Sequence, residues 1–338
     1  MARFLLRRLA GSSAVLLGVS IITFALARVI PSDAAAMYIG PKARPEDILR
    51  VAHKLGLDQP LPVQYLTYMR DLLTGDWGTS IGTKRPVLDE ILSRLPATIE
   101  LIIAALLLAV VAGVGLGVLS ARWRGRSPDV LVRVGSIAGV SLPAFWLGLI
   151  LQVFFFRTLH LLPLAGQVDV DLRFTNPIVP VTGLVVVDAI LGGNWAGLAD
   201  AAAHLVLPAV TLAAYPLGLI ARMTRASMLE ALEQDYVRTA RAYGLRNSQI
   251  IYRLALRNAL IPVTTVVGLS LAYALTGAFF VEIIFNWPGL GTFVVHSLLN
   301  VDYPAIMGVT LFGAAAYVAI NLVVDIVQAW LDPRVKLA

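Results

Sequence analysis

Six apolar stretches, each long enough to cross a lipid bilayer as a helix, limit what this chain can fold into. They are residues 9–27, 101–121, 134–156, 201–221, 259–281 and 305–324. A bilayer core needs about 20 mostly apolar residues in a helix, and lipid offers no partner to an open backbone. The chain is 58% hydrophobic and only 14% charged, which is typical of membrane proteins. We therefore predict an all-α integral membrane protein with six transmembrane helices.

The basic residues predict that both ends of the chain are cytoplasmic. More than half of the 27 Lys and Arg residues fall in segments that an inner N-terminus places inside, and the two later outer segments hold only Arg157 and Arg173. Residues 28–94 hold nine of the other Lys and Arg residues, but loops longer than about 60 residues do not set topology by charge. We interpret MARFLLRRLA as the amphipathic start of a retained first helix rather than a cleaved signal peptide.

Residues 178–198 are apolar enough to suggest a seventh span. They include Pro180, Asp188 and a Gly-Gly pair, and an Asp in the bilayer centre costs about 2.5–3.5 kcal/mol. A seventh span would also place the Arg-rich segment 222–257 outside. We predict instead a helix that lies on the outer face or dips into it.

The stretch DYVRTARAYGL, residues 235–245, is polar in an otherwise apolar chain. No proline or glycine interrupts residues 221–243, so we expect the fourth helix to continue out of the membrane through them. Gly244 is expected to end that helix in the left-handed conformation, and Ser248 can cap the next one. The prediction is a helix–glycine–helix elbow within a cytoplasmic loop, 222–258. The alternative is an ordinary solvated loop of the positive-inside kind.

Sequence motifs for catalysis or cofactor binding are not apparent. The chain has no cysteine, its four histidines lack metal-ligand spacing, and GTSIGTKR has the wrong spacing for a phosphate-binding loop. Gly113 and Gly117 lie in an uncharged span, where the small-xxx-small spacing predicts close contact with another helix. We expect no cofactor or metal in this chain and no nucleic acid partner.

Polar groups within spans are candidates for a gate or pathway, since they are costly in lipid. Gln152 lies in the third span, Glu282 at the outer end of the fifth, and Asn321 and Asp325 one turn apart in the sixth. Gln152 and Glu282 could equally lie in a subunit interface. For Asp325, we favour a structural bond to the elbow over a cytoplasmic gate.

Several motifs together resemble the ABC importer permeases. Arg238-Thr239-Ala240, Gly244 and Leu260-Ile261-Pro262 resemble their EAA-type cytoplasmic loop, with Arg238 in place of the usual Glu, as in the dipeptide/oligopeptide branch. The motifs NWPGLG at 286–291, DYP at 302–304, DPR at 332–334 and GDWG at 75–78 with Ser80 agree with that branch. The resemblance covers nearly the whole chain.

The resemblance implies a type I ABC importer permease fold with a helical extracytoplasmic insertion between the first two spans. It implies a bacterial inner-membrane location, a second permease subunit, two ATPase subunits that bind ATP and Mg, and an extracytoplasmic binding protein. The implied ATPase-coupling residues are Asp235, Tyr236, Arg238, Thr239, Ala240, Arg241, Gly244 and Leu245. Trp287, Pro288 and Gly289 would contact the binding protein.

The expected organisation is residues 1–30 as lead-in and first span, 31–96 as the extracytoplasmic segment, and 97–338 as the core permease domain. The expected function is ATP-driven import of di- or oligopeptides, with no catalysis by this chain. Nickel chelates, glutathione and oligosaccharides remain alternative substrates within the same family. An ion-driven secondary transporter and a membrane enzyme with its site in residues 31–96 are alternatives from other classes.

Overall fold

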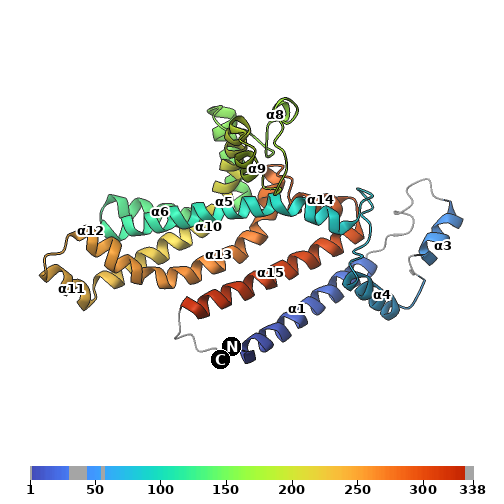
Figure 1. Ribbon diagram of the computed structural model, residues 1–338, viewed down its shortest axis with the longest axis horizontal. Helices are drawn as coiled ribbons and strands as arrows, with labels where there is room; N and C mark the ends of the chain where they lie inside the picture. The colour runs from blue at the N-terminus through green and yellow to red at the C-terminus, as the bar shows by residue number, and fades with distance from the viewer. Residues whose placement is uncertain (1, 30–43, 55–57, 332–338) are drawn as a thin grey trace. The chain divides into compact units, whose positions relative to one another are not determined.

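The computed structural model describes residues 2–29, 44–54 and 58–331, and this part is helical apart from loops and one isolated bridge between Thr79 and Pro86. The N-terminal helices are α1 (Ala2–Val29), α3 (Pro45–Lys54) and α4 (Leu61–Leu73). They are followed by α5 (Val87–Arg122), α6 (Ser127–Ser141), α7 (Ala144–Leu151), a π-helical turn (Gln152–Thr158), α8 (Val170–Thr175) and α9 (Val185–Leu191) (Figure 1). The DPR motif at 332–334 lies outside the described residues.

The remaining helices include the longest in the chain. They are α10 (Trp195–Leu232), α11 (Asp235–Ala242), α12 (Asn247–Gln249), a π-helical turn (Ile250–Ala255), α13 (Leu256–Ile284), α14 (Leu290–Leu299) and α15 (Tyr303–Leu331). Within the described residues, five helical segments are long and apolar enough to cross a membrane, and the bent pair α6–α7 brings the number to six if it counts as one span. The prediction of an all-α membrane protein is confirmed.

The third predicted span is not a straight helix. Ser127–Ser141 and Ala144–Thr158 meet at an angle of 112°. Leu142 is extended, with φ −81° and ψ 130°, because the following Pro143 disfavours helical geometry in its neighbour and cannot donate a backbone hydrogen bond. Counting apolar residues missed this break, since Leu142 and Pro143 do not interrupt the apolar run.

Residues 178–198 form no span within the described structure, as predicted. The short helix α9 ends at Leu191, and Trp195 already begins α10. Asp188 is buried, and its carboxylate accepts hydrogen bonds from the Thr182 hydroxyl (2.7 Å) and the Gly183 backbone N–H (2.9 Å). Burial alone would raise the pKa of Asp188, but these hydrogen bonds outweigh it, so the pKa lies below its ordinary value.

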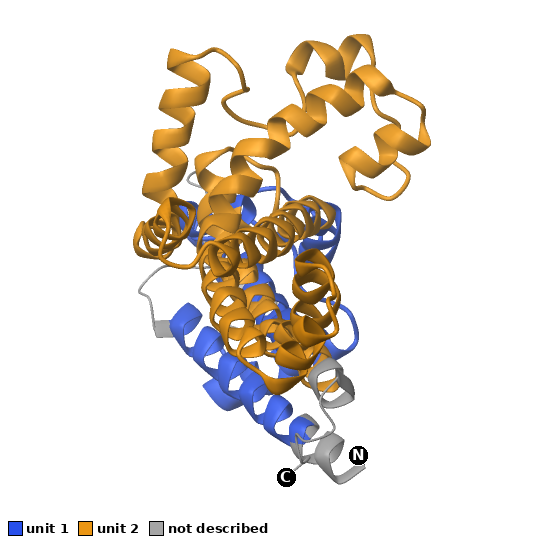
Figure 2. Cartoon of the chain, turned by 90° about the vertical axis from the view of Figure 1, so that its left-hand side faces the viewer, with its two compact units in different colours: residues 1–95, 292–319 blue, residues 96–291, 320–338 orange. Residues whose placement is uncertain are grey.

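The chain divides into two compact units, residues 1–95 with 292–319 and residues 96–291 with 320–338 (Figure 2). In the second unit α10 packs against α13, α6 and α7. Its core includes Leu101, Leu212, Ile220 and Val281, each at most 2% exposed. In the first unit, Phe24 and Ala27 of α1 pack with Tyr303 and Met307 of α15.

Glycines bring α5 and α10 into close contact, as the Gly113-x-x-x-Gly117 spacing predicts. A Cβ at Gly117 would lie 2.5 Å from Thr224 Cβ, and one at Gly113 would lie 2.8 Å from Ile220 Cγ2. In contrast, Gly115 on the same helix has nothing within 4 Å of such a Cβ. The small residues Gly113 and Gly117 therefore serve a helix–helix contact.

We expect Gly117→Val to destabilise the protein by about 1–3 kcal/mol, because the added methyl groups force α5 and α10 apart in a packed interior. The matched control is Gly115→Val, which makes the same change on the open side of α5 and should differ by less than about 0.5 kcal/mol. Thermal unfolding of the two purified variants checks this. Equal destabilisation would contradict the assigned contact.

Candidate functional site

The elbow at residues 235–245 is a separate short helix, not a continuation of the fourth span. The long helix α10 ends at Leu232, and Gln234 is extended, with φ −70° and ψ 154°, before α11 begins at Asp235. The expectation of one unbroken helix to residue 243 is therefore wrong. The reason is packing: α11 carries a buried apolar side, Val237 and Ala240, which turns back onto Ile250.

Gly244 terminates α11 as predicted. Its φ is +75°, which is rare for residues with a side chain. The Leu245 N–H donates to the Ala240 carbonyl (3.1 Å) and the Gly244 N–H to the Arg241 carbonyl (3.0 Å). These two bonds form a Schellman motif, which satisfies the last carbonyls of the helix and reverses the chain toward α12.

The next helix begins differently from the prediction. Asn247 is its first residue, so Ser248 lies inside the first turn and is not the cap. The Gln249 side chain instead accepts a bond from the Arg246 backbone N–H (3.3 Å). A π-helical turn, Ile250–Ala255, then leads into α13, and its inner side chains Ile251 and Ala255 pack with Met228 of α10.

The exposed side of α11 carries most of the implied coupling residues. Asp235, Tyr236, Arg238, Thr239, Arg241 and Leu245 are exposed, whereas Ala240 is 7% exposed and Val237 is fully buried. Arg238 pairs with Asp235 at 3.1 Å, but both side chains are solvated, so this pair adds little stability. The polar residues thus face outward on a short helix whose apolar side packs against Ile250 of the π-helical turn.

A buried ion pair joins α6 and α10, and the sequence pattern did not indicate it. Asp129 of α6 is 1% exposed, and Arg225 of α10 binds it through two bonds, Nε to Oδ1 (2.7 Å) and NH2 to Oδ2 (2.9 Å). The Ser120 hydroxyl (2.6 Å) and the Gly125 N–H (2.9 Å) donate to the same carboxylate. The carboxylate thus connects α5, the loop after it, α6 and α10.

Glu282 and Gln152 lie inside the second unit. The Glu282 side chain is fully buried, and its carboxylate accepts from the Thr98 hydroxyl (2.6 Å) and the Gly291 N–H (2.5 Å). Gln152 is 7% exposed and donates through Nε2 to the carbonyls of Leu164 (3.0 Å) and Ile284 (3.1 Å). Both polar side chains therefore form hydrogen bonds with other segments of this chain.

The NWPGLG segment forms a tight turn around these groups. Trp287 is 1% exposed, and its indole N–H donates to the Ala97 carbonyl (2.8 Å). A Cβ at Gly289 would overlap the Glu282 carboxylate. Of the three residues implied as binding-protein contacts, Pro288 is exposed, whereas Trp287 and Gly289 are buried.

Asn321 and Asp325 lie on α15, partly buried and one helical turn apart. This spacing places them on one side of the helix, as the sequence predicts. Their role in a gate or in a bond to the elbow stays a prediction.

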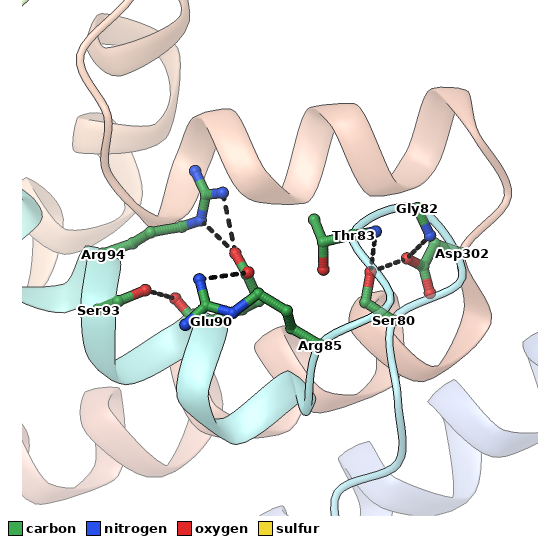
Figure 3. A network of polar contacts seen from close by, with 8 residues as sticks. All are labelled: Ser80, Gly82, Thr83, Arg85, Glu90, Ser93, Arg94 and Asp302. Carbon is green, nitrogen blue, oxygen red and sulfur yellow. Dashed lines mark hydrogen bonds and ion pairs between the residues drawn. The ribbon is translucent and has the colours of Figure 1, made fainter.

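A polar network in the first unit joins two of the motifs that carried the resemblance. Ser80, which follows GDWG, donates to the Asp302 carboxylate (2.5 Å), as does the Gly82 N–H (3.0 Å) (Figure 3). Nearby, Glu90 accepts from Arg94 (2.9 Å) and Arg85 (3.2 Å). Residues 220 positions apart are thus fixed side by side, which their separate positions in the sequence did not indicate.

Among the described residues, no group of three or more His, Cys, Asp or Glu side chains is placed to hold a metal ion. The polar sites found here pair with arginine, hydroxyl or backbone donors. These hydrogen bonds join helices and loops of this chain.

Comparison with known proteins gives matches along nearly the whole chain. Residues 113–337 match the model of the "Binding-protein-dependent transport system inner membrane component" family, and residues 1–102 match its N-terminal counterpart. A probable D,D-dipeptide transport system permease protein of Escherichia coli is 48% identical, covering 95% of this chain and 94% of the relative. A dipeptide transport system permease protein of Alkalihalophilus pseudofirmus is 42% identical (99% and 100%), and a glutathione transport system permease protein of Salmonella typhimurium is 37% identical (99% and 99%).

Proposed function

Because the chain belongs to the family of inner membrane components of binding-protein-dependent transport systems, we propose that it imports di- or oligopeptides. We also propose that an ATPase subunit binds its elbow. The family makes it a multi-pass transport subunit that works with a substrate-binding protein and an ATPase. The observation that supports the proposed coupling role is that α11 is a short helix with an apolar inner side and a polar outer side. Membership of this family favours ATP-driven import over ion-driven secondary transport and over membrane catalysis.

We propose an assembly of this chain with a second permease subunit and two ATPase subunits, each permease elbow docking on one ATPase. Arg238 and Arg241 are exposed cations that acidic groups of an ATPase groove can pair with. ATP binding can shift the transporter between inward- and outward-open states only through contacts that differ between those states. The turn at Gly244 fixes α11 to the following helix, so a push on α11 reaches α13.

The remaining assignments follow from this topology. Both termini would lie in the cytoplasm, residues 31–96 would form the extracytoplasmic segment, and 97–338 the core domain. Pro288 is the exposed member of the proposed binding-protein contact. For Asp325 the favoured role is a structural bond to the elbow, and a cytoplasmic gate with Asn321 is the alternative. Glu282 and Gln152 would act by holding the outer ends of helices in place.

A peptide is the proposed substrate because the relatives with 48% and 42% identity are named for dipeptide transport. Glutathione is the second candidate, because a relative at 37% identity is named for its transport.

Transport by the reconstituted assembly tests the proposal. The chain, its second permease and the ATPase would be reconstituted in proteoliposomes. The binding protein and labelled dipeptide would be added on the same side of the membrane. We expect uptake that requires ATP and binding protein and resists a proton uncoupler. Uptake that continues without nucleotide but collapses with the uncoupler would contradict it. Competition with unlabelled glutathione or nickel chelate then identifies the substrate class.

A further inference from the structure

A cavity in the first unit has the features of a ligand site that the transport role does not use. Its volume is about 350 Å³, within the range of small-molecule sites. The cavity lies between the end of α1, α4, the loop at 76–81 and the start of α15. The walls include the aromatic rings of Phe24, Tyr68, Trp77 and Tyr303.

The cavity lies where two candidate membrane spans end. The span Ala10–Arg28 finishes at the cavity with Arg28, and the span Tyr303–Ile326 starts there with Tyr303. Ends of apolar spans lie at the level of the lipid headgroups, where Tyr and Trp are enriched. The cavity is therefore at the height of one membrane surface.

Two buried hydrogen-bond donors on its wall have no acceptor among the described residues. They are Nε of Arg28 and the hydroxyl of Tyr68. The Arg28 guanidinium lies 5.3 Å from the centre of the Phe24 ring, and the Tyr68 ring stacks on the same ring at 5.9 Å. Burial raises the pKa of Tyr68 to about 12, so its hydroxyl keeps its proton at neutral pH. Unsatisfied buried donors are costly, and an anionic oxygen would satisfy both.

The same cavity also offers negative charge. Asp71 and Asp76 line it. Arg70 binds one oxygen of Asp71 (2.8 Å), and the Gly78 N–H binds one oxygen of Asp76 (2.9 Å). Each carboxylate has a second oxygen, which can accept a bond from an ammonium group. The surrounding aromatic rings also favour a cation.

We propose that this cavity binds the headgroup of a zwitterionic phospholipid with a primary ammonium, a phosphoethanolamine. The phosphate would accept from Arg28 and Tyr68, and the ammonium would donate toward Asp71 and Asp76. Its acyl chains would lie along the exposed apolar residues of α1, such as Ile22 and Leu26. The bound lipid would fasten the ends of α1 and α15 to the membrane surface. This inference does not rest on the proposed peptide specificity or on the elbow.

Lipid retention by the assembled transporter tests the proposal. The complex is purified from vesicles of equal phosphatidylethanolamine, phosphatidylcholine and phosphatidylglycerol, and native mass spectrometry counts the lipids that remain. We expect phosphatidylethanolamine to be retained at least fivefold over each of the others. Phosphatidylcholine lacks the N–H donors, and phosphatidylglycerol lacks the cation. Equal retention of all three, or preference for phosphatidylglycerol, would overturn the proposal.

Variants locate the binding. Tyr68→Phe and Arg28→Gln should each reduce the preference for phosphatidylethanolamine at least threefold. The matched control is Tyr65→Phe, since the Tyr65 hydroxyl pairs with Ser20 (2.8 Å) and does not line the cavity. Thermal unfolding checks that each variant is folded. If Arg28→Gln is unstable, Tyr68→Phe still tests the site, because it removes only the hydroxyl and keeps the aromatic ring. Unchanged preference in folded Tyr68→Phe would overturn the assignment, and so would displacement of the lipid by a soluble dipeptide.

Discussion

Gly244→Val should reduce ATP-driven uptake more than tenfold while the protein still inserts into the membrane. A β-branched residue at φ +75° costs about 1–3 kcal/mol, and an isolated helix of this length has little stability of its own. The strain would open the two bonds that close the turn, Leu245 N–H to Ala240 and Gly244 N–H to Arg241. ATP hydrolysis would then proceed with little transport, or the ATPase would fail to bind.

Two variants separate this effect from general strain. Gly244→Asn should keep most of the activity, because asparagine adopts the left-handed conformation more readily than other side chains. Gly193→Val places the same strain at φ +64°, between α9 and α10, where a Cβ has nothing within 4 Å. Uptake and ATP hydrolysis would be measured together in proteoliposomes. Normal coupled uptake by Gly244→Val, or equal loss in Gly193→Val, would count against a specific role of the elbow.

Arg225→Ala should destabilise the protein by about 3 kcal/mol. The change leaves the Asp129 carboxylate buried without its cation, and breaking a buried pair in this way typically costs 3–5 kcal/mol. We expect the lower end because the Arg225 side chain is 22% exposed. Ser120 and Gly125 still donate to Asp129, which also limits the loss. Thermal unfolding of the purified protein measures the change.

The chain supplies a matched surface pair as the control. Arg124 and Glu233 are 3.1 Å apart with side chains 63% and 70% exposed, so Arg124→Ala should cost less than about 1 kcal/mol. The double variant Asp129→Ala with Arg225→Ala should cost clearly less than the sum of the two single changes, since each single change leaves one charge unpaired and the double variant leaves none. Additive losses would show that the two residues do not act as a pair.

The sequence was sufficient to predict structural features that depend on local composition or spacing. Apolar length identified the spans, and the spacing of Gly113 and Gly117 identified the contact with α10. Gly244 was recognised because few other residues suit the end of such a helix. These features follow from what the backbone requires of lipid or of one turn.

The sequence was insufficient to predict features that packing between distant segments determines. The break between α10 and α11 occurs without proline or glycine, because Val237 and Ala240 gain burial against Ile250. Asp129 and Arg225 are 96 positions apart, and Ser80 and Asp302 are 222 apart, so nothing in the local pattern pairs them. Ala240 is one of the implied coupling residues, but it is 7% exposed and packs with Val237 and Ile250 within this chain.

Labelling of one introduced cysteine tests the central claim most directly. The chain has no cysteine, and Tyr243 is 82% exposed beside Gly244, so Tyr243→Cys provides a single reactive site. We predict that a membrane-impermeant maleimide labels it in inside-out vesicles but not in right-side-out vesicles, and that assembly with the ATPase subunits protects it. Labelling from the outer side, or equal labelling with and without the ATPase, would contradict a cytoplasmic elbow that an ATPase grips.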